Sequence, residues 1–168
     1  MGLQKKIQLL FVALLTVTFL NAQNKPASPA AVATGKINGA TIQINYSSPS
    51  VKGRVIWGEL VPFNKIWRAG ANDATTIETD KELNIEGQKL PAGKYSFFVI
   101  PSEKECVLIF NKEAKQWGAY KYKETEDQLR VVVKQKIVET STENLVYTIE
   151  KNSIVLRWEK WNIPFSVK

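Results

Sequence analysis

One segment of the sequence has polar and aromatic residue types that suit ligand binding. From Trp67 to Thr76 the chain reads WRAGANDATT, in which Arg68, Asn72 and Asp73 are surrounded by small residues. An arginine can hold a carboxylate through two parallel hydrogen bonds, and asparagine and aspartate can bond to hydroxyl groups. Trp67 adds a flat apolar face for a sugar ring. These residue types together predict a site for a sugar or a carboxylate.

The same residues also allow a purely structural interpretation. Arg68 would pair with a neighbouring acid, Asn72 would occupy a turn with positive φ, and Trp67 would fill the core. A second irregular stretch contains Arg54 and Trp57, of which Arg54 is alternatively a surface cation or an ion-pair partner. If the two stretches meet in space, the ligand-binding residues are Arg54, Trp57, Trp67, Arg68, Asn72 and Asp73.

The chain contains no histidine and a single cysteine, Cys106. Without histidine, the usual general base near neutral pH, the Ser-His and Cys-His nucleophile pairs and histidine-containing metal sites are excluded. Cys106 begins the apolar run CVLIF, which predicts a buried and unreactive thiol. The composition therefore argues against an enzyme, and it indicates no cofactor and no metal.

Catalysis without histidine would have to rest on carboxylates, as it does in glycosidases, or on a serine activated by a lysine. Ser48 or Ser50 with Lys52 resembles such a pair only by proximity, and Pro49 and Gly53 more simply mark a turn. Glu59, Asp73 and Glu78 lie near the irregular segment. A catalytic pair is defined by its separation in space, which spacing along the chain does not give. A carboxylate-dependent hydrolase acting on envelope or extracellular material is therefore an alternative function.

The first 22 residues have the order of a secretory signal peptide. Lys5 and Lys6 precede a mostly apolar run over 7–20, and the small residue Ala22 ends the segment. This run is shorter than the roughly 20 apolar residues of a membrane span, so we expect cleavage after Ala22 and no integral span afterwards. The protein is then exported, to the periplasm or outside the cell. Residues 23–33, rich in Pro, Ala, Asn and Ser, predict a flexible leader.

Residues 34–168 predict a single all-β domain, because apolar and polar residues alternate with period two and turn residues recur regularly. Asn38-Gly39 and Glu86-Gly87 predict hairpin turns. The later strands are expected at 93–100, 106–110, 129–138, 145–149, 154–158 and 163–167, with short helical turns at most within 113–120 and 124–129. Nine or ten strands with little helix favour a two-sheet antiparallel β-sandwich, jelly-roll or immunoglobulin-like, with a closed barrel as the alternative.

Five tryptophans stand at positions 57, 67, 117, 158 and 161. We expect most of them in the core, because a sandwich needs large side chains to fill the gap between its sheets. Trp57 and Trp67 lie outside the alternating pattern and are expected to be the more exposed.

The formal net charge is +7, from 23 Lys plus Arg and 16 Asp plus Glu. The lysines are scattered among acids, as on a solvated surface, so we expect no nucleic-acid partner. The sequence indicates no particular oligomeric state.

A series of short motifs extends from Tyr46 to Trp158. They are SPSVKGR at 48–54, WG at 57–58, IWRAGANDATT at 66–76, LPAGKYS at 90–96, FN at 110–111 and GAY at 118–120. Together they resemble a family of secreted bacterial proteins catalogued as domain of unknown function 2911. The resemblance implies an exported, single-domain, all-β protein and no particular activity. Cys106 departs from the aromatic residue that members often carry there.

The irregular Trp67–Thr76 segment would form a loop at one end of the sandwich, where binding sites are common. The sequence therefore predicts a binding module for a small polar ligand or glycan. The alternatives are the hydrolase and a structural or interaction domain without a pocket.

Overall fold

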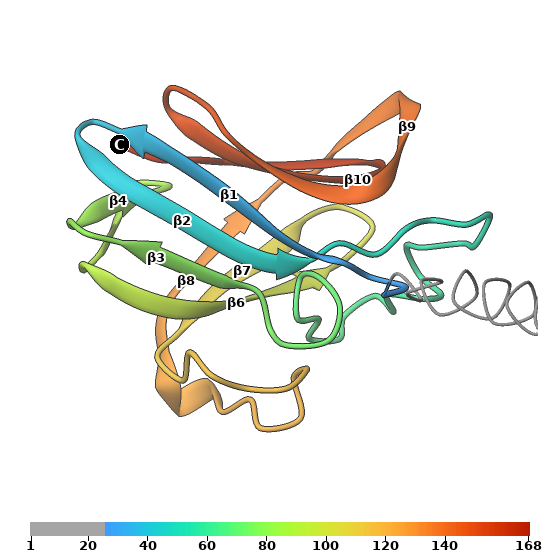
Figure 1. Cartoon of the computed structure of the whole chain (residues 1–168), viewed down its shortest axis with the longest axis horizontal. Helices are drawn as coiled ribbons and strands as arrows, with labels where there is room; N and C mark the ends of the chain where they lie inside the picture. Colours follow the sequence, from blue (N-terminus) through green and yellow to red (C-terminus); the bar gives the residue numbers. More distant parts are fainter. Residues whose placement is uncertain (1–25) are drawn as a thin grey trace, which may run out of the picture.

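The computed structural model of the chain describes residues 26–168 (Figure 1). The predicted signal peptide and the first three residues of the predicted leader lie outside the described residues. Ten strands and one short 3₁₀ helix form the described part. Their bounds are β1 Ala30–Ile37, β2 Ala40–Ser47, β3 Thr76–Thr79, β4 Leu83–Ile85, β5 Gln88–Leu90, β6 Gly93–Pro101, β7 Cys106–Asn111, η1 Glu124–Glu126, β8 Asp127–Val133, β9 Lys136–Ile149 and β10 Ser153–Ser166.

The strands form antiparallel sheets of six, two and two strands. The large sheet has the order β1-β2-β3-β6-β7-β8, and β9 and β10 form a long hairpin. Figure 1 shows this hairpin lying across one face of the large sheet. The small β4–β5 hairpin contacts the end of β10, where Asn84 and Lys168 exchange two backbone hydrogen bonds of 2.8 and 2.9 Å. The predicted all-β, sandwich-like antiparallel fold is confirmed, and the sheets do not close into a barrel.

Both predicted hairpin turns are present. Asn38 and Gly39 have φ values of 49° and 79°, and Glu86 and Gly87 have φ values of 49° and 87°. Positive φ at both central residues matches the right-handed twist of the flanking strands, which is why these residue pairs connect β1 to β2 and β4 to β5.

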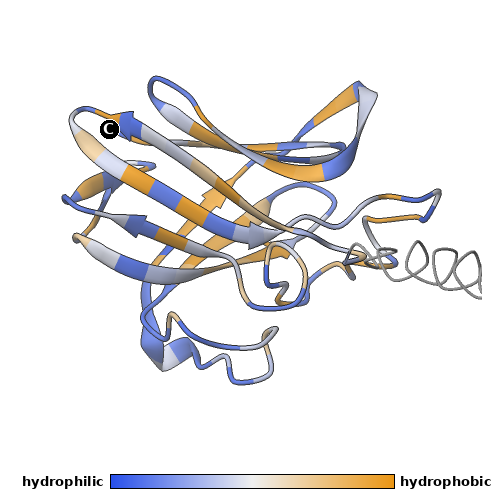
Figure 2. Cartoon of the chain, viewed as in Figure 1, coloured by the Kyte–Doolittle hydropathy of each residue, from blue (hydrophilic) through white to orange (hydrophobic). Residues whose placement is uncertain are grey.

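The core lies between the large sheet and the β9–β10 hairpin. Hydrophobic and polar residues alternate along β2 (Figure 2), with Ile42 and Ile44 fully buried. The rings of Phe97 and Phe110 on the large sheet meet Phe165 of β10 at centroid distances of 5.7 and 6.2 Å. Aromatic contacts therefore join the two layers.

Residues 112–126, here called the strap, connect β7 to β8 and cover part of the other, outer face of the large sheet. Phe98 and Ile109 lie on this face and are fully buried. Tyr122 of the strap packs against Phe98 with a centroid distance of 5.2 Å. The strap contains η1 but no helix over 113–120, where a short helical turn was one expectation.

Several strand boundaries differ from the sequence prediction. The strand expected over 129–138 is divided, because β8 ends at Val133 and β9 begins at Lys136. Between them, Gln135 donates from Nε2 to the carbonyls of Ser102 and Glu103 at 2.9 and 3.0 Å. This tertiary contact has no signature in an alternating pattern. The strands expected at 154–158 and 163–167 form one strand, β10, with an irregularity at Glu159.

The predicted flexible leader extends too far into the fold. Ala30 to Ala33 belong to β1 and pair with residues 44–47 of β2. Small side chains suit this edge, since a Cβ on Gly35 of the same strand would lie 2.7 Å from Ile149 Cγ2. The leader was predicted to end at residue 33 because residues 23–33 show no apolar periodicity. A strand rich in alanine does not show this periodicity either, so the sequence pattern did not reveal it.

Candidate functional site

A tight turn after β2 places two cations at one end of the sandwich. Lys52 and Gly53 have φ values of 48° and 68°, the pattern of a type I′ turn, and Arg54 N donates to Val51 O at 3.1 Å. Val51 N in turn donates to Glu143 O of β9 at 2.8 Å. The turn is therefore fixed to the β9–β10 hairpin.

The Arg54 side chain folds back over this turn. Its Nε donates to Val51 O at 3.0 Å, and its Nη2 donates to Ser50 O. A guanidinium group has five N–H donors, so three of them remain free of these two contacts. Arg54 is thus held in place with donors to spare for an anion.

The loop from Trp67 to Thr75 forms the opposite side of the same end. Trp67 exchanges two backbone hydrogen bonds with Val99 of β6, at 2.8 and 2.9 Å. Ala69 O accepts from Tyr147 Oη at 2.7 Å and from Thr75 Oγ1 at 2.9 Å. Burial of Tyr147 raises its pKa well above the ordinary value, so it remains a neutral donor. The loop is irregular but firmly held.

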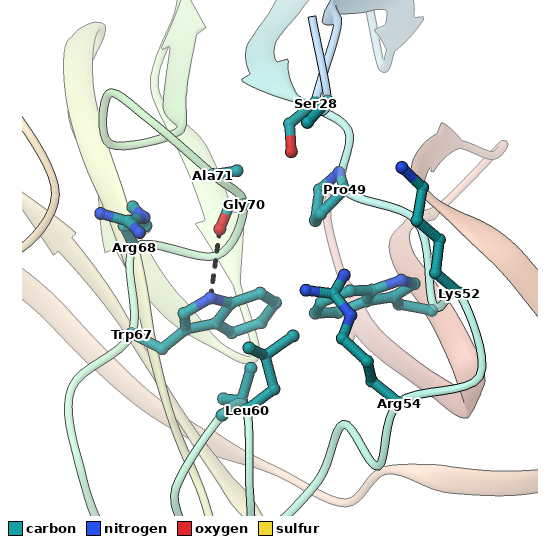
Figure 3. Close-up of a pocket in the computed structure, with 12 residues that line it drawn as sticks. Ser28, Pro49, Lys52, Arg54, Leu60, Trp67, Arg68, Gly70 and Ala71 are labelled. Atoms are coloured by element: carbon teal, nitrogen blue, oxygen red, sulfur yellow. Dashed lines mark hydrogen bonds between the residues drawn. The ribbon is translucent and has the colours of Figure 1, made fainter.

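Gly70 allows this loop to pack closely. A Cβ at this position would lie 2.9 Å from Thr75 Oγ1 and 3.1 Å from Ser47 O, so a larger residue would push the loop outward. Gly70 O also accepts from Trp67 Nε1 at 3.2 Å (Figure 3). The indole of Trp67 is fixed by its own loop.

Four tryptophans and Phe63 cluster beneath the loop. Trp67 stacks on Trp158 at 5.8 Å, and Trp57 stacks on Trp161 at 4.3 Å. The edge of Trp57 meets Trp67 at 5.7 Å, and Phe63 lies 6.0 Å from Trp161. The cluster joins two irregular segments to β10 and gives the end of the sandwich an aromatic wall.

These parts enclose a cavity of about 370 Å³, here called the mouth cavity. Its lining residues combine apolar walls with cations and include no acid: Ala27, Ser28, Pro49, Lys52, Arg54, Leu60, Val61, Trp67, Arg68, Gly70, Ala71 and Trp158. Figure 3 shows the guanidinium of Arg54 reaching toward the space above Trp67, with Lys52 and Ser28 around it. The cavity can hold an apolar ring beside a negative charge.

Two buried indole N–H groups in this cluster have no hydrogen-bond partner. They are Nε1 of Trp57 and Nε1 of Trp158. Trp158 is 1% exposed and lines the mouth cavity. A buried donor without an acceptor is uncommon in native structures. Both nitrogen atoms are almost fully shielded, so neither faces the open part of the cavity in this structure.

The structure brings together part of the predicted site. Arg54, Trp67 and Arg68 line the mouth cavity, and Trp57 packs behind Trp67. The Arg68 guanidinium nevertheless extends away from Arg54 (Figure 3), toward the backbone of Gly118. The Arg68 guanidinium therefore lies on the side of the loop that faces the strap.

Asn72 and Asp73 do not line this cavity. Asn72 has a φ of 58°, and its Nδ2 donates to Ser47 Oγ at 3.3 Å and to Ser28 O at 3.4 Å. The turn interpretation thus describes Asn72 better than the ligand interpretation. Asp73 pairs with Trp117 of the strap in an isolated antiparallel bridge.

Comparison with known protein families gives a match to residues 28–167. The matching family is described as Protein of unknown function (DUF2911). This chain belongs to that family. Neither a search of curated proteins nor a search of solved structures found a match to the DUF2911 chain.

A second hollow of the DUF2911 protein, here called the outer groove, lies on the outer face of the large sheet and has a volume of about 530 Å³. Its lining comes from β1, β2, β3, β6 and two loops: Ala30, Ala31, Val32, Asn45, Tyr46, Ser47, Asp73, Ala74, Thr76, Lys94, Ala114, Lys115 and Gln116. The sequence did not reveal this groove, because its residues are spread over some ninety positions.

The acids of the hydrolase alternative are not gathered in one cavity. Asp73 lines the outer groove, whereas Glu78 pairs with Lys94 at 3.3 Å and Glu59 lines neither cavity. Among residues 26–168, no group of three His, Cys, Asp or Glu side chains is placed to hold a metal ion. In the same residues, no helix has the length and apolarity to cross a membrane.

Sequence reasoning missed some residues of the DUF2911 site and misplaced another. Lys52 and Trp158 line the mouth cavity, although neither is among the predicted ligand-binding residues. Trp117, expected in the core, is 58% exposed, while Trp57 and Trp67 are half-buried. Cys106 is fully buried as predicted, and burial raises the pKa of its thiol to about 12.

Proposed function

We propose that this DUF2911 protein is a binding module that holds a small, ring-bearing anion in the mouth cavity. The observation that carries the proposal is the pairing of Arg54, which keeps free donors, with a tryptophan wall in a cavity that no acid lines. Pockets of this size and mixed character are typical of small-molecule sites.

The chemistry of the lining indicates how such a ligand would lie. Its ring would pack against the indole of Trp67, which stacks on the buried Trp158, and its carboxylate would accept charge-assisted hydrogen bonds from Arg54 and Lys52. A sugar acid or an aromatic carboxylate meets both requirements.

A titration of the protein with D-glucuronate and D-glucose, and with benzoate and benzamide, tests this function. The Trp117→Phe background removes the exposed indole, so that fluorescence reports the remaining tryptophans. We expect at least one acid to change the fluorescence and its neutral counterpart to bind about tenfold more weakly, because the charge is lost.

Arg54→Gln should weaken binding of that acid by about tenfold. Lys65→Gln, which removes an exposed cation outside both cavities, should leave it unchanged. Absence of binding for both acids, or equal binding by the Arg54→Gln protein, would reject the proposal.

A further inference from the structure

Arg68 carries a charge that nothing in the described part of the chain neutralises. The residue is half-buried, its Nε is shielded and has no hydrogen-bond partner, and it belongs to none of the ion pairs of residues 26–168. Withdrawing a guanidinium group from water without a counter-charge is costly. An anionic ligand would remove this cost.

The surroundings of Arg68 include exposed aromatic side chains. A Cβ on Gly118, whose φ is 62°, would lie 2.8 Å from Arg68 Nη1 and 3.0 Å from Tyr120 Cε2. The guanidinium and the Tyr120 ring therefore approach the same short piece of strap backbone. Tyr120 is 84% exposed and the neighbouring Trp117 is 58% exposed. Flat aromatic faces beside a cation suit a sugar ring that carries a carboxylate.

The strap connects this position to the outer groove. Lys115 and Gln116 line the groove, Trp117 follows them, and Gly118 lies against Arg68. Ala74 N donates to Gln116 O at 3.0 Å and Gly118 N donates to Asn72 O at 3.1 Å, so the strap and the loop before β3 run side by side. Within residues 115–120 the strap therefore passes from the outer groove to the exposed aromatic residues and to Arg68.

The groove floor combines hydrogen-bonding groups with apolar side chains, mainly of alanine and valine. A row of facing residues crosses the sheet from the edge strand β1 to β6: Val32, Asn45, Thr76 and Ser96. At the inner end, Gln116 donates from Nε2 to Ser96 Oγ at 3.1 Å, while its buried Oε1 has no partner. Lys115 adds positive charge, Lys94 is paired with Glu78 at 3.3 Å, and Asp73 adds a carboxylate.

We propose that the outer groove and the strap form a second binding site for an acidic oligosaccharide, a chain of sugar rings bearing carboxylates. Arg68 binds a carboxylate, Tyr120 and Trp117 contact ring faces, and the groove side chains bond to hydroxyl groups. The site shares Arg68 with the lining of the mouth cavity, but the Arg68 guanidinium extends away from Arg54 and toward the strap. A hydroxyl group of the ligand donates to the Asp73 carboxylate, while the ligand carboxylate lies at Arg68.

Calorimetric titration with tetragalacturonate and with its fully methyl-esterified form tests the proposal. The two probes share a backbone and differ in charge. We expect the acid to bind and the ester to bind about tenfold more weakly or not at all. Arg68→Gln should weaken binding of the acid by a similar factor. Lys160→Gln, in the β9–β10 hairpin, should leave binding of the acid unchanged.

Tyr120→Ala provides a second variant, since this exposed side chain can be removed with little effect on folding. This variant should bind the acid severalfold more weakly. Equal affinity for acid and ester, unchanged binding by both variants, or equally strong displacement by oligodeoxythymidylate would overturn the proposal. A loss in Arg54→Gln instead of Arg68→Gln would place the oligosaccharide in the mouth cavity and would also overturn it.

Discussion

Tyr122 ties the strap to the edge of the large sheet through its hydroxyl group. The hydroxyl donates to Asp127 Oδ2 at 2.6 Å and accepts from Arg130 Nη2 at 2.7 Å. Arg130 Nε also donates to Asp127 Oδ2 at 2.6 Å, and Asn111 Nδ2 donates to Asp127 Oδ1 at 2.8 Å. Each of these four side chains has a hydrogen-bond partner within the network, so the network fixes the position of the strap next to the outer groove.

Tyr122 should make stability depend on pH in the alkaline range. Burial, and then the bond to Asp127, raise its pKa to about 12 from an ordinary value of about 10. Its contribution is complete below about pH 10. Between about 10 and 12 the unfolded chain loses the proton first, so the free energy of unfolding falls as pH rises.

Urea denaturation of wild type and Tyr122→Phe at about pH 8, 10 and 11 measures this dependence. We expect the variant to lose about 1–2 kcal/mol at pH 8, after allowance for solvent screening, and to show a shallower alkaline decline. Tyr120→Phe, a change at an exposed ring, should follow the wild-type curve. An equally steep decline in Tyr122→Phe would contradict the assignment.

The conformation of the strap depends on Gly118, which has positive φ. A Cβ at this position would meet the end of the Arg68 side chain and the ring of Tyr120. We expect Gly118→Ala to lose about 1 kcal/mol from backbone strain, as should Gly53→Ala, where φ is 68° and no atom lies within 4 Å of the new Cβ. Only Gly118→Ala should weaken acidic oligosaccharide binding, because its Cβ displaces Arg68 and Tyr120. Thermal denaturation and calorimetry separate the two effects, and equal binding by both variants would contradict this role.

At the scale of secondary-structure elements, sequence patterns predicted those turns and strands that depend only on neighbouring residues. Asn38-Gly39 and Glu86-Gly87 fix their own turns, and the dense β-branched and aromatic runs in β6 and β7 define strands without help from neighbours. The break after Val133 could not be predicted in this way, since it depends on hydrogen bonds from Gln135 to a turn more than thirty residues earlier.

The candidate site was partly predictable for a related reason. The Trp67–Thr76 segment is conspicuous, because glycine and alanine interrupt an alternating chain. Trp158, in contrast, has the period of an ordinary core residue and reaches the mouth cavity only because β10 packs beneath that loop. Trp117 was expected in the core because a sandwich needs large side chains between its sheets, but it lies exposed in the strap, whose sequence has no pattern that separates covering from exposed residues.

The whole molecule depends on contacts between its two layers. Phe165 of β10 is 1% exposed and packs against Phe97 and Phe110 of the large sheet. The tryptophan cluster likewise joins β10 to both irregular segments. Neither layer can therefore bury its apolar face without the other, and both cavities lie on surfaces that this shared core holds rigid.

One cooperative unfolding transition should follow from this shared core. In a Trp117→Phe background, fluorescence reports the tryptophans near the mouth cavity, while far-UV circular dichroism reports the strands of all sheets. We expect the two urea curves to coincide. Phe165→Leu should shift both midpoints together, with a loss of about 1–2 kcal/mol from the smaller side chain. If the fluorescence curve moves alone, the β9–β10 hairpin unfolds separately, and a mouth cavity built from both layers would lose one wall before the large sheet melts.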